Sequence, residues 1–183
     1  QLAALSTGDL NSLTTAQFAA MASTQVAGFT TAQIAALETA DLAALGTDVI
    51  KALSTAQIDA LTTDQLPKLT GEQVTALTTA QLAALSTGDL NALTSAQFAA
   101  FASTQVAGFT TARIAVLETA DVAALSTAGI KGLTTAQIVA LTTDQIPALT
   151  TAQAAALSST QVAALETADV AALQTADLVA IST

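Results

Sequence analysis

Large apolar residues recur every eight positions along this chain. One series runs without a lapse from Leu5 to Ile181, and a second keeps step with it from Leu10 to Leu178, with Ala154 as its clearest lapse. Between them the chain repeats a phrase that is clearest at residues 77–84, Leu-Thr-Thr-Ala-Gln-Leu-Ala-Ala. A fixed short period is typical of arrays built by stacking one unit. We number this octad from one to eight, so that the two apolar series occupy positions one and six.

The polar residues of the octad have the pattern of a helix start. Thr78 at position two and Gln81 at position five have the spacing of a capping box, in which two backbone donors are satisfied reciprocally. Leu77 and Leu82 flank this pair as in a hydrophobic staple, and two alanines, which are strong helix formers, follow. Each octad therefore predicts a helix of one to two turns and then a tight corner. Positions one and six form the core, position five holds corners or neighbouring coils, and either Thr could be the cap.

Two other architectures fit the pattern less well. In a continuous α-helix, eight residues overshoot two turns by roughly 80°, so the apolar stripe would wind around the helix. A β-solenoid-like array, the alternative fold, needs alternating polarity, whereas positions one and six lie on opposite faces of a strand. The sequence therefore predicts an all-α, elongated solenoid of short helices. Pro67 and Pro147, both at position seven, predict a looser or 3₁₀ turn in their octads, or a later helix start.

The exceptions to the octad recur at a longer period of eighty residues, as Lys51 and Lys131 do. We therefore predict a single continuous octapeptide-repeat solenoid over residues 1–183, with superrepeat copies at 4–83 and 84–163 and the start of a third at 164–183. The chain opens at Gln1 and closes at Thr183 inside the repeat, and neither end carries an atypical capping octad. Repeat arrays need covered ends, so we expect a segment of a longer protein, or ends covered by another copy.

Composition narrows the range of partners. The net charge is −10 with only four basic residues, which argues against nucleic acid and anionic membrane surfaces. Polar residues return within every octad, so no window approaches about 18 uninterrupted apolar residues and membrane insertion is not expected. With no Trp or Tyr and five Phe, the core must consist mainly of Leu, Ile, Val and Ala. Layers made of a few such small side chains are typical of an elongated array.

The chain lacks the residues of common active sites. Without His or Cys it has no imidazole base, no Ser-His dyad and no ordinary zinc site. Glu38 with Asp41, and Glu118 with Asp121, could serve acid–base chemistry, but they lie at positions two and five, where a helix N-terminus favours negative charge. We therefore expect no catalytic, cofactor-binding or metal-binding residues and no enzymatic activity. We also expect Gln81→Glu to be mild.

The phrase Leu-Thr-Thr-Ala-Gln-Ile/Leu-Ala-Ala, found at 77–84 and with Ile at 133–140, resembles octapeptide tracts of very large bacterial secreted proteins. Those proteins are adhesin-like or RTX-like, and the resemblance implies export and display at the cell surface. It transfers no catalytic residue to this chain. The Gly-Asp calcium nonapeptides of RTX repeats are missing here.

These features together predict a structural protein. We expect a stalk or a self-assembling extracellular fibre on a bacterial surface, whose partners are copies of itself, end to end or side by side, or flanking repeats of a longer chain. An adhesin-type binding module for a protein or glycan is the alternative, although interfaces are usually anchored by the aromatic and Arg residues that are scarce here. The Thr rows leave ice binding as a third option, which capping by the same hydroxyls would oppose.

Overall fold

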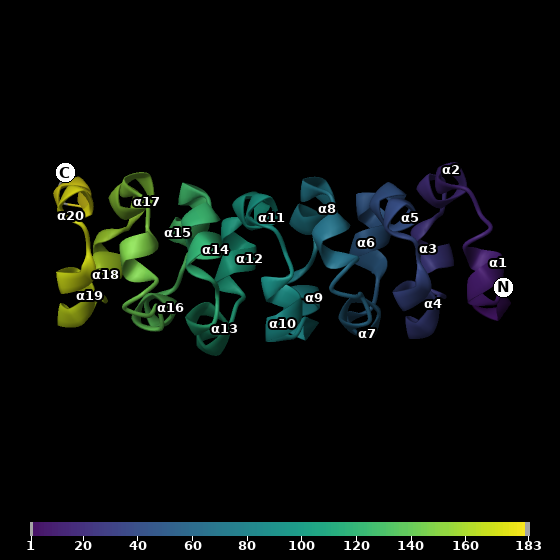
Figure 1. Ribbon diagram of the computed structural model, residues 1–183, viewed down its shortest axis with the longest axis horizontal. Helices are drawn as coiled ribbons and strands as arrows, with labels where there is room; N and C mark the ends of the chain where they lie inside the picture. The colour runs from purple at the N-terminus through teal and green to yellow at the C-terminus, as the bar shows by residue number, and fades with distance from the viewer. Residues whose placement is uncertain (1, 182–183) are drawn as a thin grey trace. The chain divides into compact units, whose positions relative to one another are not determined.

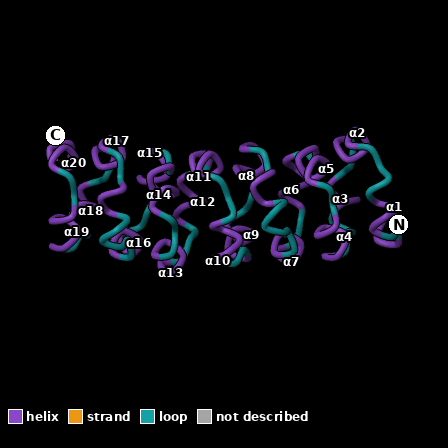
Figure 2. The backbone as a smooth tube through the Cα atoms, viewed as in Figure 1, coloured by secondary structure: helices purple, strands orange, loops and turns teal. Residues whose placement is uncertain are grey.

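The computed structural model describes residues 2–181, and Figures 1 and 2 show its short helices joined by short corners. The chain divides into two compact units, residues 1–93 and 94–183. All regular structure in the described range is helical. The prediction of an all-α solenoid of short helices is therefore confirmed, and the β-solenoid alternative is wrong. The ends discussed above, Gln1 and Thr183, lie outside the described residues.

Each helix of the first unit occupies a single octad, apart from a short leading turn. These elements are η1 (Leu2–Ala4), α1 (Thr7–Leu10), α2 (Thr15–Ala19), α3 (Ser23–Val26), α4 (Thr31–Ala36), α5 (Thr39–Ala44), α6 (Thr47–Ala52), α7 (Thr55–Asp59), η2 (Leu66–Lys68), α8 (Gly71–Ala76), α9 (Thr79–Ala84) and α10 (Thr87–Asn91).

The second unit repeats this plan. Its elements are α11 (Ser95–Ala100), α12 (Ser103–Ala107), α13 (Thr111–Ala115), α14 (Thr119–Ala124), α15 (Thr127–Gly132), α16 (Thr135–Val139), η3 (Ile146–Ala148), α17 (Thr151–Ala156), α18 (Ser159–Val162), α19 (Thr167–Ala172) and α20 (Thr175–Ile181).

The helix starts follow the predicted capping box. In α9 the Thr78 hydroxyl accepts a hydrogen bond from the backbone N–H of Gln81 at 3.2 Å. In return the backbone N–H of Thr78 donates to Oε1 of Gln81 at 2.8 Å. Thr78 has extended backbone angles, φ −75° and ψ 158°, as an N-cap should. The cap is therefore the residue at position two, and the Thr at position three is the first residue of the helix.

The two proline octads depart from the α-helix in the same way. Pro67 lies in η2 and Pro147 in η3, which are both 3₁₀-helices of three residues. Proline has no backbone N–H, so an α-helical bond cannot close at position seven. The prediction of a 3₁₀ turn at these octads is confirmed.

The core of each unit consists of the two apolar series. At position six, Ile50 and Leu82 are fully or almost fully buried, and at position one Leu53 and Leu77 are only slightly less so. The helix pairs in contact are three octads apart, as in α2 with α5, α6 with α8 and α17 with α20. Each octad thus packs beside the octad that follows three later.

Two helices of the second unit approach so closely that only glycine fits. Gly132 ends α15, and a Cβ atom added there would lie 2.3 Å from the carbonyl oxygen of Ser103 at the start of α12. Eighty residues earlier the corresponding residue is Ala52. The two copies of the superrepeat therefore differ in how closely this pair of helices can pack.

We predict that Gly132→Ala destabilises the protein by roughly 1–3 kcal/mol, because the added methyl group overpacks the contact with Ser103. Urea unfolding followed by circular dichroism measures the change. Gly88→Ala is the matched control, since its Cβ would meet only the Ser86 hydroxyl oxygen at 3.7 Å. Within α10 this second substitution should be neutral or stabilising by up to about 1 kcal/mol. Equal effects of the two variants would contradict the close approach.

Candidate functional site

The residue at position five links one coil of the array to the next. Gln81 has 2% of its surface exposed, and its Nε2 donates to the carbonyl oxygens of Ile50 at 2.8 Å and Leu53 at 2.7 Å. These carbonyls lie at the C-terminal end of α6, where α-helical backbone partners run out, although the Ile50 carbonyl also accepts the N–H of Leu53 at 3.3 Å. The Oε1 of the same side chain accepts the N–H of Thr78. One amide therefore caps the start of its own helix and the end of another.

We call this set of bonds a rung: the position-five Gln donates to the carbonyls of the residues 31 and 28 positions earlier. The same pair of bonds recurs in both units. Rungs are made by Gln33, Gln57, Gln65, Gln73, Gln81, Gln137, Gln145, Gln153 and Gln161. Each rung reaches the helix that starts four octads earlier, whereas lateral packing joins octads three apart. One coil therefore holds between three and four octads.

Aspartate at position five uses a different partner. An ionised carboxylate accepts hydrogen bonds and cannot donate to a carbonyl, and Asp is one methylene shorter than Gln. Oδ1 of Asp41 instead accepts the Thr15 hydroxyl at 2.9 Å, and Oδ1 of Asp177 accepts the Thr151 hydroxyl at 2.9 Å. In both pairs the donor lies at position three, 26 residues earlier. Position three thus supplies the hydroxyl that these two buried carboxylates accept.

Burial raises the pKa of Asp121, one of the paired carboxylates. Asp121 is almost completely buried, and burial, together with the nearby Glu118, raises its pKa from 3.8 to about 6, while the Ser95 hydroxyl lowers it. The sequence indicated that the helix N-terminus would favour this charge. In the folded chain the pKa is raised instead, and the largest cause is the removal of the carboxylate from water.

The amino-acid pattern alone places Gln81 in a cap and gives position five the role of holding corners or neighbouring coils, but it does not place the side chain in the interior. One signal does exist in the sequence: position five never carries Glu, although Glu serves a capping box as well as Gln does. Asp is one methylene shorter and does occur there, so the absence of Glu indicates that a carboxylate as long as the Gln side chain, which would face the carbonyls without a proton to donate, is disfavoured. Gln81→Glu is therefore expected to be destabilising rather than mild. The substitution puts a charge in a buried site and removes the donor to two carbonyls.

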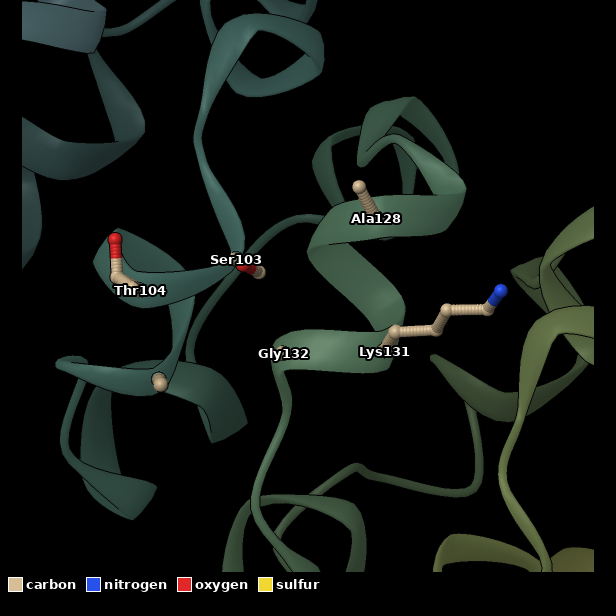
Figure 3. A pocket seen from close by; sticks show the side chains of 6 residues that line it. Ser103, Thr104, Ala128, Lys131 and Gly132 are labelled. Atoms are coloured by element: carbon tan, nitrogen blue, oxygen red, sulfur yellow. The ribbon is translucent and has the colours of Figure 1, made fainter.

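A shallow hollow lies in the second unit between α12 and α15 (Figure 3). It encloses about 380 Å³ and its lining is mostly apolar, from Ser103, Thr104, Ala107, Ala128, Lys131 and Gly132. In Figure 3 the Lys131 side chain extends away from Ser103 and Thr104. The hollow therefore offers small side chains and no convergent set of polar groups that could orient a ligand.

Two other kinds of site are absent from residues 2–181. No three His, Cys, Asp or Glu side chains gather there closely enough to hold a metal ion. Among the same residues, no helix is both long and apolar enough to cross a membrane. The rungs are thus the polar arrangement that recurs most often in this part of the chain.

The short helices, their octad register and the rungs define an α-solenoid of octapeptide repeats. The chain belongs to the ALTTAQ repeat family, which matches four tandem segments, residues 2–39, 34–71, 83–117 and 114–151. This assignment agrees with the repeat tract inferred from the phrase at 77–84. Neither the curated proteins nor the solved structures include a match to the chain.

We predict that Gln81→Glu lowers the free energy of unfolding by about 3–5 kcal/mol, as expected when a buried charge is left without a partner. Urea unfolding at pH 7.5 measures the loss. Gln17→Glu is the matched control: Gln17 also lies at position five but is exposed, so it should change stability by no more than about 0.5 kcal/mol. Losses of similar size in both variants would show that the rung is not what makes Gln81 sensitive.

We predict that the contribution of Asp121 to stability falls as the pH rises. Its pKa is about 6 in the folded chain against an ordinary 3.8, so the folded state binds more protons between these values and acidification through this range stabilises it. Asp121→Asn should therefore melt at a higher temperature than the wild type at pH 7.5, with the difference shrinking towards pH 4. Asp48→Asn, which removes an exposed charge, is the control. A difference that does not vary with pH would refute the assignment to Asp121.

Proposed function

We propose that this chain is a structural element, a stalk or fibre that sets distance rather than performing chemistry. The observation that carries the proposal is the use of its buried polar side chains. Gln57, Gln81 and Gln153 are each committed at both ends of the amide to backbone groups of the array. A buried polar group whose hydrogen-bond donors and acceptors are all paired within the fold has none left to bind a substrate.

The absence of catalysis is part of the same proposal. The sequence has no His and no Cys, and three of its position-five carboxylates accept hydroxyl groups of other octads, as Asp41 does from Thr15. Placement outside a bacterial cell also belongs to the proposal. Its support is the resemblance of the octad phrase to tracts of large secreted proteins.

Two other functions have less support. A binding module needs exposed anchors, but Phe18, Phe29, Phe98, Phe101 and Phe109 are all buried, and the hollow beside Gly132 has no convergent polar groups. Ice binding would use rows of free Thr hydroxyls. The position-two hydroxyls are engaged in helix caps instead, as in α4, α8 and α17.

We predict that the length of the particle grows in proportion to the number of octads. Inserting a second copy of residues 84–163 should increase the maximum dimension in small-angle X-ray scattering by about 40%, because a repeat array extends in one dimension. A compact domain with the same added length would grow by only about 15%.

The helical signal per residue in circular dichroism should be the same in both proteins, which controls for the folding of the insert. Growth near the compact value, with the insert folded, would overturn the proposed stalk. Measurements below the overlap concentration, extrapolated to zero concentration, separate the length of one chain from association between chains.

A further inference from the structure

Rungs are unevenly distributed along the eighty-residue copies of the repeat. Four successive octads of the first copy carry a rung, at Gln57, Gln65, Gln73 and Gln81, and the four octads eighty residues later do the same. The two octads just before each run have other residues at position five, namely Asp41 and Val49 in the first copy and Asp121 and Gly129 in the second. We call these two-octad stretches, residues 37–52 and 117–132, the rung-free segments.

The position-five residues of the rung-free segments cannot donate to a carbonyl at neutral pH. Val49 is buried and apolar, and Gly129 has no side chain. Asp41 and Asp121, when ionised, only accept hydrogen bonds, and each takes one hydroxyl from 26 residues earlier, at 2.9 and 3.4 Å respectively. A Gln rung, by contrast, supplies two N–H···O bonds to the preceding coil. The coil interface at a rung-free segment is therefore held mainly by apolar packing.

Contacts between coils join near neighbours along the chain. Within each unit the helix pairs in extensive contact are three octads apart, and the side-chain hydrogen bonds between coils span 25–31 residues. Such an array gains its stability one interface at a time rather than from a single shared core. A coil that leaves its neighbour also loses its helices, because helices of four to seven residues do not persist alone. Separation and unfolding of a coil are therefore one event.

We propose that the array is extensible: under tension it yields one coil at a time, and the coil interfaces at the rung-free segments open at lower force than those with four successive rungs. The inference rests on the proposed structural role and adds elasticity to it. One coil spans about 28 residues, the shorter of the two rung offsets. Unfolded, it is about 95 Å long at roughly 3.4 Å per residue, against the roughly 10 Å between packed coils. Each step therefore lengthens the chain by about 85 Å. Refolding is fast because the contacts are local in sequence.

The two rung-free segments differ in how closely they pack against the preceding coil. In the second copy Gly132 lets α15 approach the backbone of Ser103 at the start of α12. In the first copy the corresponding residue is Ala52, whose methyl group rules out such a close approach. The interface at residues 37–52 thus lacks both the rungs and the tight backbone contact. It is the weaker of the two, and Val49 is the residue through which it can be strengthened.

We predict that the full chain, held by its two ends in magnetic tweezers, lengthens and shortens in reversible steps of about 85 Å. Val49→Gln should add a rung. The new Oε1 can accept the N–H of Gly46, as Oε1 of Gln25 accepts that of Ala22 at 2.8 Å without a hydroxyl cap, and the new Nε2 reaches the carbonyls 31 and 28 positions earlier. At a fixed force one step should shift about tenfold towards the folded state, because two hydrogen bonds are gained.

Two further variants complete the test. Gln73→Met removes a rung but keeps a side chain of similar volume, so it should shift one step at least about tenfold towards the unfolded state. Ala56→Gln adds an exposed Gln at position four, where no rung can form, and should leave every step unchanged.

Three results would overturn the proposal. One is release of a whole unit, such as residues 94–183, in a single step of roughly 300 Å. The others are a shift of the Val49→Gln step towards the unfolded state, and steps that neither Val49→Gln nor Gln73→Met moves. None of these results would touch the stalk proposal, which the scattering measurement of chain length tests separately.

Discussion

The glutamine amide at position five is the interaction on which the rest of this structure depends. A helix of four to seven residues, the range from α1 to α20, leaves most of its backbone groups without partners inside the helix. Helices this short do not persist alone in water. Gln81 resolves both difficulties at once, since its carbonyl oxygen caps the start of α9 and its amino group caps the end of α6. Short helices are stable here because the same amide caps the start of its own helix and the end of another.

The rung also explains why the core can be so thin. A solenoid that relied on apolar burial alone would need large side chains in every layer, but here the layers contain mainly Leu, Val, Ile and Ala. Besides Phe18 and Phe29 in the first unit, the larger side chains form a cluster in the second unit, where Phe101 stacks edge-on against Phe98 and Phe109 with ring centroids 5.4 and 5.5 Å apart. Elsewhere, the hydrogen bonds between coils fix the register that close packing of larger residues would otherwise provide.

Much of the fold follows from local rules that a sequence displays directly. The caps, the staple and the proline turns depend on residues within one octad. The local roles of Thr78, Gln81 and Pro67 could therefore be predicted from the sequence alone. The coil could not, because it depends on the angle accumulated over several corners, which no single octad specifies. The bond from Gln81 to Ile50 was out of reach for this reason. The raised pKa of Asp121 was missed for a related reason, since its burial arises from octads that are distant in sequence.

The switch from Gln to Asp at position five has a consequence for how such an array can lengthen. A Gln rung needs only backbone carbonyls, which every octad supplies, so an octad with Gln can be copied anywhere. A buried Asp can instead accept a hydroxyl 26 residues earlier, as Asp41 does from Thr15 and Asp121 from Ser95. These two pairs are themselves eighty residues apart. Position three carries Ser or Thr in almost every octad, so an octad with Asp also meets a hydroxyl donor wherever it is inserted, and the array can lengthen by single octads of either kind.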